Sequence, residues 1–173
     1  MAGLGPAQRV IMGIVMLALA GLGFAVGRSV LRPSREVAQP IAFNHKIHTE
    51  VLECETCHEF ARTGAHSGLP GLSTCLECHE EPVTESAEER KIVELAAAGG
   101  EQVFRKLFRL PDNVFYTHRR HVGIAEIECA TCHGSIAQTT SPPPIPLVRI
   151  TMDFCIDCHR ASGASEGCIG CHR

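Results

Sequence analysis

The ten cysteines of this 173-residue chain form five pairs, and two residues separate the members of each pair. A histidine directly follows the second cysteine of every pair, so the motif C-x-x-C-H occurs five times and leaves no cysteine over. The paired cysteines are Cys54/Cys57, Cys75/Cys78, Cys129/Cys132, Cys155/Cys158 and Cys168/Cys171. The adjacent histidines are His58, His79, His133, His159 and His172. A disulfide framework would not need these histidines, so the spacing favours ligand or attachment chemistry over cross-linking.

The C-x-x-C-H motif is typical of covalent haem attachment. Its two thiols add to the vinyl groups of one haem, and the histidine then lies beneath the iron as an axial ligand. A single copy would also be compatible with zinc or with a thiol redox pair. Zinc sites use four ligands in sets such as Cys₄ or Cys₂His₂, and ten cysteines with five adjacent histidines do not divide into such sets. We therefore predict five covalently bound haem c groups.

Five further histidines lie outside the motifs, which is the number of sixth ligands that five haem irons need. They are His45, His48, His66, His118 and His121. Imidazole is a common axial ligand, so we take these side chains as the candidate distal ligands. Met152 offers the other common ligand type, although simple packing is the plainer interpretation of that side chain. Five bis-histidine irons would have low potentials and no open position for a substrate.

Four of these histidines form two H-x-x-H pairs, each of which follows an aromatic residue and precedes a motif by a short spacer. The two stretches read FNHKIHTEVLECETCH (43–58) and YTHRRHVGIAEIECATCH (116–133). Histidines three positions apart on a helix point about 60° apart, whereas the two axial ligands of a haem lie on opposite faces. The members of a pair must therefore serve two different haems, which holds those haems close together.

The rest of the composition offers little else from which to build an interior. The chain has seven Phe, one Tyr and no Trp, and residues 36–173 provide roughly 28 residues for each haem. We expect a mostly irregular and α-helical multihaem fold with little or no β structure. In such a fold the porphyrins supply the apolar bulk, and the chain does not fold stably without them. The formal net charge of −3 gives no indication of a nucleic-acid partner.

An apolar segment near the N-terminus precedes all of the motifs. Residues 10–26 contain no charged or strongly polar side chain, and Arg9 and Arg28 flank them. We predict one uncleaved transmembrane helix over residues 10–31, since about 20 helical residues span a bilayer. A signal peptide is the alternative, because Ala18-Leu19-Ala20 resembles a cleavage site.

The orientation of this anchor rests on two opposing signals. Arg28, Arg32 and Arg35 favour a cytoplasmic location for the C-terminal end of the helix. However, c-type haem is attached outside the cytoplasm, and we give this second signal precedence. We expect a single pass through the cytoplasmic (inner) membrane, with a cytoplasmic tail over residues 1–9 and the haem domain on the periplasmic side.

Beyond the anchor, the motifs divide the chain into two halves that look like diverged repeats. We expect a linker over residues 32–40, a dihaem module over 41–82, a helical linker over 83–113 and a trihaem module over 114–173. Within the helical linker, Ser86 to Glu89 fit a capping box for a helix that ends at Gly99-Gly100. A second short helix is predicted over residues 102–109, halted by Pro111.

The order F-x-H-x-x-H and then C-x-x-C-H resembles the class III multihaem cytochromes c. The resemblance implies that the first histidine of each pair binds the haem of the next motif and that the second binds the haem after it. On this chain the implied ligand pairs are His45/His58, His48/His79, His118/His133 and His121/His159. The haem on His172 then lacks a local partner, and we expect His66 to reach it from the first half of the chain.

A closer resemblance covers nearly the whole chain, and it rests above all on LPDNVFYTHRRHV (110–122) and TMDFCIDCH (151–159). These segments resemble the pentahaem, membrane-anchored cytochrome subunit of alternative complex III and its relatives in quinone reductase complexes. The resemblance implies an electron-transfer subunit rather than an enzyme. It implies an iron–sulfur/molybdopterin-like subunit and polytopic quinone-binding subunits as partners. The role would be an electron relay between a quinol-oxidising or quinone-reducing membrane complex and a soluble cytochrome or other periplasmic redox carrier.

Two other functions remain as alternatives. A stand-alone, single-anchor multihaem quinol dehydrogenase would use the same chemistry, but it usually needs a haem whose distal ligand is modified or absent. A multihaem reductase enzyme needs an open iron site with acid–base groups nearby. The equal numbers of motif histidines and spare histidines disfavour both.

Overall fold

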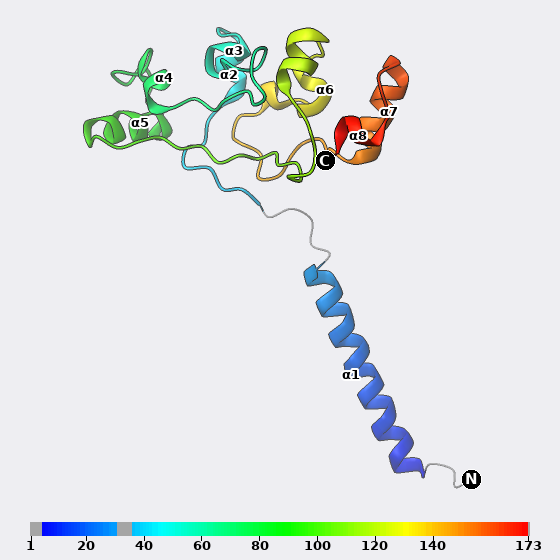
Figure 1. Ribbon diagram of the computed structural model, residues 1–173. Coiled ribbons are helices and arrows are strands. Elements are labelled where there is room, and N and C mark those ends of the chain that lie inside the picture. The colour runs from blue at the N-terminus through cyan, green and yellow to red at the C-terminus, as the bar shows by residue number, and fades with distance from the viewer. Residues whose placement is uncertain (1–4, 31–35, 173) are drawn as a thin grey trace. The chain divides into compact units, whose positions relative to one another are not determined.

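The computed structural model describes residues 5–30 and 36–172 (Figure 1). The helices are α1 (Pro6–Val30), α2 (His45–Thr49), α3 (Cys54–Cys57), α4 (Leu72–Leu76), α5 (Ala87–Ala97), α6 (Cys129–His133), α7 (Met152–Ser162) and α8 (Cys168–Cys171), with a π-helical turn η1 (Arg119–Ile124) and a 3₁₀ turn η2 (Ile136–Gln138). The chain divides into two units, Met1–Arg35 and Glu36–Arg173. The two modules expected from the sequence both lie within the second unit.

Helix α1 makes up most of the first unit, and it confirms the expected N-terminal helix with bounds of Pro6–Val30. Its 25 residues extend over about 37 Å, which exceeds the roughly 30 Å hydrocarbon core of a bilayer. Large apolar side chains such as Ile14, Leu17 and Leu22 are exposed along it. The helix is long and apolar enough to cross a membrane, a test that a signal sequence near the N-terminus also passes.

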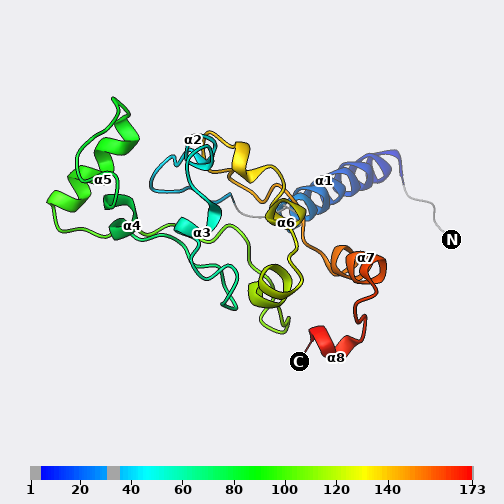
Figure 2. The same ribbon diagram turned by 90° about the horizontal axis from the view of Figure 1, so that it is seen from above.

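The second unit consists of short helices joined by irregular segments, as the sequence predicts. Within residues 36–172 no strand forms, and the β structure is a single antiparallel bridge between Val114 and His172. Helices α4 and α5 lie at one end of this unit and α7 and α8 at the other, with α3 and α6 between them (Figures 1 and 2). In each of the five C-x-x-C-H motifs a helix begins at the first cysteine or three residues before it.

The polypeptide provides very little apolar core of its own. In the described part of the chain, the buried hydrophobic residues are Ile41, Ala61 and Ile92. Large side chains such as Val51 and Ile169 are exposed although they lie next to motif cysteines or close to them. A domain of this size normally stabilises itself by burying many such groups. The shortage agrees with an interior that another apolar body completes.

Helix α5 forms as predicted, but one part of its expected N-terminal motif does not. The Ser86 hydroxyl accepts the backbone N–H of Glu88 at 3.3 Å, and the helix ends before Gly99, whose φ of +67° suits glycine. A capping box would also bring Glu89 back to the backbone N–H of Ser86. Instead, the Ser86 N–H donates to the Thr84 hydroxyl at 3.1 Å, and the Glu89 carboxylate turns toward the second motif.

The predicted helix over residues 102–109 is wrong, because this segment is irregular and extended. The side-chain amide of Gln39 makes two hydrogen bonds with the backbone of Arg105. It donates to the Arg105 carbonyl at 2.7 Å and accepts the Arg105 N–H at 2.9 Å. Phe104 contacts Phe43, with ring centroids 6.3 Å apart, and Phe108 contacts His133 at 4.6 Å. These tertiary partners replace the i→i−4 bonds of a helix and outweigh its local propensity.

Several backbone hydrogen bonds join the first half of the second unit to the second half. Helix α2 packs on η2, where the Lys46 N–H donates to the Thr139 carbonyl at 3.1 Å. The loop after α3 packs on the start of η1, where the Gly64 carbonyl accepts the Arg119 N–H at 2.8 Å. Gly123 approaches the same loop so closely that a Cβ there would lie 2.0 Å from the Arg62 carbonyl oxygen.

Candidate haem sites

The two H-x-x-H segments place their second histidine in the same way. Phe43 stacks on His48 with ring centroids 4.4 Å apart and an interplanar angle of 28°. Tyr116 stacks on His121 with a centroid distance of 4.5 Å and the same angle of 28°. The aromatic residue before each pair is therefore a packing surface for the imidazole, and the repeat seen in the sequence is also a repeat in geometry.

The first histidine of each pair meets the same aromatic ring at its edge. The Phe43 and His45 rings lie 4.8 Å apart at 85°, and the Tyr116 and His118 rings lie 5.1 Å apart at 83°. Edge-to-face contacts of this kind are favourable for aromatic rings. One aromatic residue thus orients both imidazoles of its pair. One imidazole stacks on its ring, and the other lies nearly perpendicular to it.

A backbone carbonyl fixes the ring of each second histidine. Nδ1 of His48 lies 2.7 Å from the Asn44 carbonyl oxygen, and Nδ1 of His121 lies 2.9 Å from the Thr117 carbonyl oxygen. The side chains of Asn44 and Thr117 also accept the backbone N–H three residues further on. Each of these residues therefore starts a short helical turn and also orients a histidine four positions later.

Three of the motif histidines also make hydrogen bonds through Nδ1. The Nδ1 partners are the Gly68 carbonyl for His58 at 2.9 Å, the Glu89 carboxylate for His79 at 2.6 Å and the Ser165 carbonyl for His159 at 2.7 Å. A ring that donates its Nδ1–H to such an oxygen carries its free lone pair on Nε2. That is the tautomer required of a metal ligand that binds through Nε2.

Three histidine pairs lie at a spacing that suits one metal atom between the two rings. The ring centroids are 6.1 Å apart for His48/His79, 6.4 Å for His118/His133 and 6.2 Å for His121/His159. Two imidazole nitrogens on opposite sides of one metal, each about 2 Å from it, would hold their centroids about 6.3 Å apart. These distances fit bis-histidine haem ligation, and they occur in three of the four pairs that the resemblance implies.

The pKa values of the rings agree with metal ligation, and they also bring in His45/His58, the fourth implied pair. Burial, and then the neighbouring His58 and His48, lower the pKa of His45. Burial is also the largest cause of the lowered pKa of His118 and of His133. A lowered pKa favours neutral imidazole, which is the form that binds a metal.

His66 and His172 are the two predicted ligands that the structure does not bring together. His66 is exposed and lies near His118. Its charge contributes, after burial, to the lowered pKa of His118, and the carbonyl of the preceding residue, Ala65, accepts the His118 backbone N–H. His172 is held by its bridge to Val114, and its Nδ1 lies 3.5 Å from the Asn113 side-chain nitrogen. In the part of the chain that the structure describes, no ring contact or hydrogen bond joins His66 to His172.

The first motif lies beside both the second and the third. Burial, and then the neighbouring Cys129, raise the pKa of the Cys54 thiol, and the two sulfurs are close enough for a hydrogen bond. Burial, and then the charges of Glu77 and Cys78, raise the pKa of the Cys57 thiol. The first motif therefore connects the two halves of the unit.

The third motif continues to the fourth, and the fourth to the fifth. Burial, followed by Cys158 and Cys155, raises the pKa of Cys132. Burial, followed by Cys171, raises the pKa of Cys155. The motifs thus follow one another in space in the order second, first, third, fourth and fifth. The positions of α4, α3, α6 and then α7 and α8 agree with this order in both views (Figures 1 and 2).

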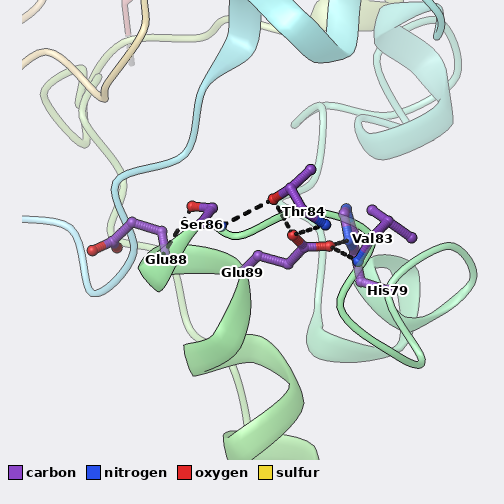
Figure 3. A network of polar contacts seen from close by, with 6 residues as sticks. All are labelled: His79, Val83, Thr84, Ser86, Glu88 and Glu89. Atoms are coloured by element: carbon purple, nitrogen blue, oxygen red, sulfur yellow. Dashed lines mark hydrogen bonds and ion pairs between the residues drawn. The ribbon is translucent and has the colours of Figure 1, made fainter.

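Glu89 is a site residue that sequence reasoning assigned to a different role. Its side chain is 5% exposed, and its carboxylate accepts hydrogen bonds from His79 Nδ1 at 2.6 Å, the Val83 N–H at 2.7 Å and the Thr84 N–H and hydroxyl (Figure 3). The hydrogen bond from the Thr84 side chain is the largest of the causes that lower the pKa of Glu89 to about 2. A buried acid ten residues after a motif histidine has no spacing signal that would have revealed this contact.

The donor set fits haem better than it fits zinc. In the ranges 5–30 and 36–172, no group of three or more His, Cys, Asp or Glu side chains could hold a metal ion, whereas a zinc site needs three or four protein ligands. A haem iron would need only two imidazoles, and three of the histidine pairs lie at a spacing that could provide them. In addition, the Gln102 Nε2 donor is buried without a hydrogen-bond partner, and a haem carboxylate would satisfy such a donor.

Comparison with known proteins agrees with this geometry. Residues 28–102 match the class III cytochrome C family. The chain is also 29% identical over 161 residues to the protein named "Menaquinone reductase, multiheme cytochrome c subunit" of Nitratidesulfovibrio vulgaris, and the match covers 78% of this chain and 77% of that relative. With five C-x-x-C-H motifs on a mostly irregular and helical fold, this chain is similar to the class III cytochromes c over residues 28–102 and to a multihaem cytochrome c subunit over most of its length.

Proposed function

We propose that this protein is a membrane-anchored pentahaem electron relay, and that it works as a subunit of a quinone-linked membrane complex rather than as an enzyme. The observation that carries the proposal is the spacing of 6.1–6.4 Å in three pairs of histidine rings. When bound, each haem c would supply a reversible one-electron iron couple. Two imidazoles bound to one iron would leave no position for a substrate, so these haems would only exchange electrons.

The ligand assignment follows the pairs. Each motif histidine serves as the proximal ligand, and His45, His48, His118 and His121 serve as the distal ligands of the first four motifs. His66 remains the candidate for the iron of the fifth motif, because it is the one spare histidine outside the two pairs. The side chains of Phe43 and Tyr116 hold the distal rings in place, and the Nδ1 partners keep Nε2 available for the iron.

The spatial order of the motifs gives the relay two ends. The second motif has the first as its neighbour, and the fifth has the fourth, so these two are the terminal sites. Electron transfer between the halves would use the haems of the first and third motifs, whose Cys54 and Cys129 lie close together. The H-x-x-H pairs support this path, since each ties two motifs to one short turn.

The relative's name supports a quinone-linked role, because that protein is a cytochrome subunit of a menaquinone reductase. We propose that α1 anchors the subunit in the cytoplasmic membrane, with its haem domain on the periplasmic side. The proposed partners are an iron–sulfur/molybdopterin-like subunit, polytopic quinone-binding subunits and a soluble cytochrome or other periplasmic redox carrier. Arg and Lys side chains could neutralise the negative charge of haem propionates.

A second candidate function is a stand-alone, single-anchor quinol dehydrogenase. The observation that favours it is the absence of a described contact between His66 and His172, since an iron without a sixth histidine could exchange electrons with a quinol directly. Replacement of the fifth proximal ligand would then abolish quinol oxidation by the isolated chain.

The two candidates differ in what a mild detergent extraction would recover. We expect the extracted protein to contain five covalent haems by mass spectrometry and to bring polytopic and iron–sulfur subunits with it. We also expect that, once separated from these subunits, it neither oxidises quinol nor reduces quinone. A lone protein that catalyses either reaction would overturn the subunit assignment, and a protein without covalent haem would overturn the whole proposal.

A further inference from the structure

We propose that Glu89 is a positioning residue that holds the haem of the second motif at a lower reduction potential than the other four. This inference rests on the proposed function, because it requires His79 to be an iron ligand. Glu89 lies in the first turn of α5 and reaches the motif histidine from outside the haem-binding segment itself (Figure 3).

The partner of His79 differs in charge from those of the other candidate ligands. Where a hydrogen bond at Nδ1 is present, the partners of the other rings are neutral. They are backbone carbonyls for His48, His58, His118, His121 and His159, the Thr139 hydroxyl for His45 and the Asn113 amide for His172. His79 alone among these described contacts faces a carboxylate, at 2.6 Å.

Several groups fix the Glu89 carboxylate in its buried position. The Val83 and Thr84 backbone N–H groups donate to it at 2.7 and 2.9 Å, and the Thr84 hydroxyl donates as well. The carboxylate also lies at the N-terminal end of α5, where the helix dipole favours negative charge. It therefore stays ionised although it is 5% exposed, and its charge acts at short range on the imidazole.

A carboxylate that accepts the Nδ1–H of a ligating histidine increases the basicity of the ring. A more basic imidazole donates more electron density to the metal and stabilises the oxidised iron, which lowers the reduction potential. The buried negative charge acts in the same direction. Because the second motif is at one end of the spatial order, the low-potential site is terminal. It would pass electrons on toward the first motif.

The first test replaces the charge and keeps the shape. In Glu89→Gln, we expect a redox titration followed by haem absorbance to show one of the five haem potentials shifted upward. The EPR spectrum of one low-spin haem should change with it. Glu88→Gln is the matched control, since it removes one negative charge from the adjacent position. Glu88 binds Ala42 N–H and Lys91 and does not contact a candidate ligand.

A second variant predicts a shift of the opposite sign. The Thr84 hydroxyl donates to Glu89, so Thr84→Val leaves more of the carboxylate charge to His79 and should lower the same potential. Thr84→Ser keeps a hydroxyl and should restore the wild-type value. Opposite shifts in E89Q and T84V cannot come from a general loss of structure, which would move both variants in one direction.

The outcomes separate this inference from the proposed function. Five covalent haems with all five potentials unchanged in E89Q would overturn the role of Glu89 and leave the relay intact. An upward shift of equal size in that haem potential in E88Q would overturn it too. The shift would then come from the loss of any nearby negative charge and not from the contact with His79. A wild-type protein without covalent haem would refute the proposed function itself.

Discussion

Tyr116 lies across the imidazole of His121, with ring centroids 4.5 Å apart and planes inclined by 28°. Phe43 and His48 repeat this arrangement 73 positions earlier in the chain, at 4.4 Å and 28°. An aromatic residue, a capping residue and two histidines thus form one structural unit that occurs in each half of the haem domain. The phenol of Tyr116 is not needed for this arrangement, since Phe43 achieves it with a plain ring.

Removal of either aromatic ring should destabilise the haem domain. Because both side chains are only partly buried, we expect Phe43→Ala and Tyr116→Ala each to cost about 1–3 kcal/mol, less than a fully buried ring. Denaturant unfolding of the haem-loaded protein, followed by absorbance, measures this loss. Tyr116→Phe is the control and should unfold as the wild type does. A destabilised Tyr116→Phe would show that the hydroxyl matters more than the ring.

Loss of a distal ligand should produce one high-spin haem. His121 is the proposed sixth ligand at the fourth motif, so in His121→Ala about one-fifth of the haem should become high-spin in EPR or magnetic circular dichroism. We expect the same fraction from His66→Ala, because His66 is the proposed ligand at the fifth motif. A His66→Ala spectrum identical to that of the wild type would instead assign that iron another ligand or none.

Acid should remove the contribution of Glu88. The ion pair with Lys91, and then the Ala42 N–H, lower the pKa of Glu88 below its ordinary value of 4.5. Since the folded pKa is the lower one, the stabilisation is fully present above pH 4.5 and disappears as the pH falls through the folded pKa. The difference in unfolding free energy between wild type and Glu88→Gln should therefore shrink below pH 4.5. A difference that grows on acidification would contradict this sign.

The contact between Gly123 and Arg62 should tolerate no side chain. An added Cβ would lie 2.0 Å from the Arg62 carbonyl oxygen, so Gly123→Ala must separate the loop after α3 from η1. We expect a loss of about 1–3 kcal/mol or more in unfolding free energy. Gly71→Ala is the control, because its Cβ would meet only the Ser73 hydroxyl at 3.8 Å. Equal stability of the two variants would show that the halves are not held together at this point.

In cells that lack the proposed partner subunits, membrane attachment should depend on α1 alone. Residues 36–173 form their own compact unit, so a variant that replaces residues 1–35 with a cleavable export signal should leave the membrane fraction and keep its five haems. Cell fractionation with haem staining tests this expectation. A haem domain that stays with the membrane in such cells, without α1, would contradict the anchoring role of the helix.

The sequence predicted those features that depend on local patterns. The apolar run before Arg28 predicted α1, and Ser86 with Gly99 predicted the start and end of α5. The irregular character of the haem domain followed from the high density of motifs. These features are set by neighbouring residues, so a single chain carries enough information to find them.

The features that the sequence did not reveal are contacts between distant residues. Phe104 and Phe108 are spaced as on a helix face, but Gln39 binds the backbone between them from 66 positions away. Glu89 occupies the third position of an apparent capping box, but the competing partner is His79. In both cases a tertiary hydrogen bond outweighed the local pattern. The ligand roles of the histidines stay predictions, although three ring pairs lie at a suitable spacing.

The shortage of buried apolar side chains, with Ile41, Ala61 and Ile92 as the described examples, has a consequence for how this protein is made. A chain whose interior arrives by covalent attachment has no native fold to present to the machinery that attaches it. Each motif must therefore be recognised by its few local residues, while the chain is still open. A chain that misses one haem attachment lacks part of its interior and stays partly unfolded. Cellular proteases would degrade such a chain before the missing haem could be added.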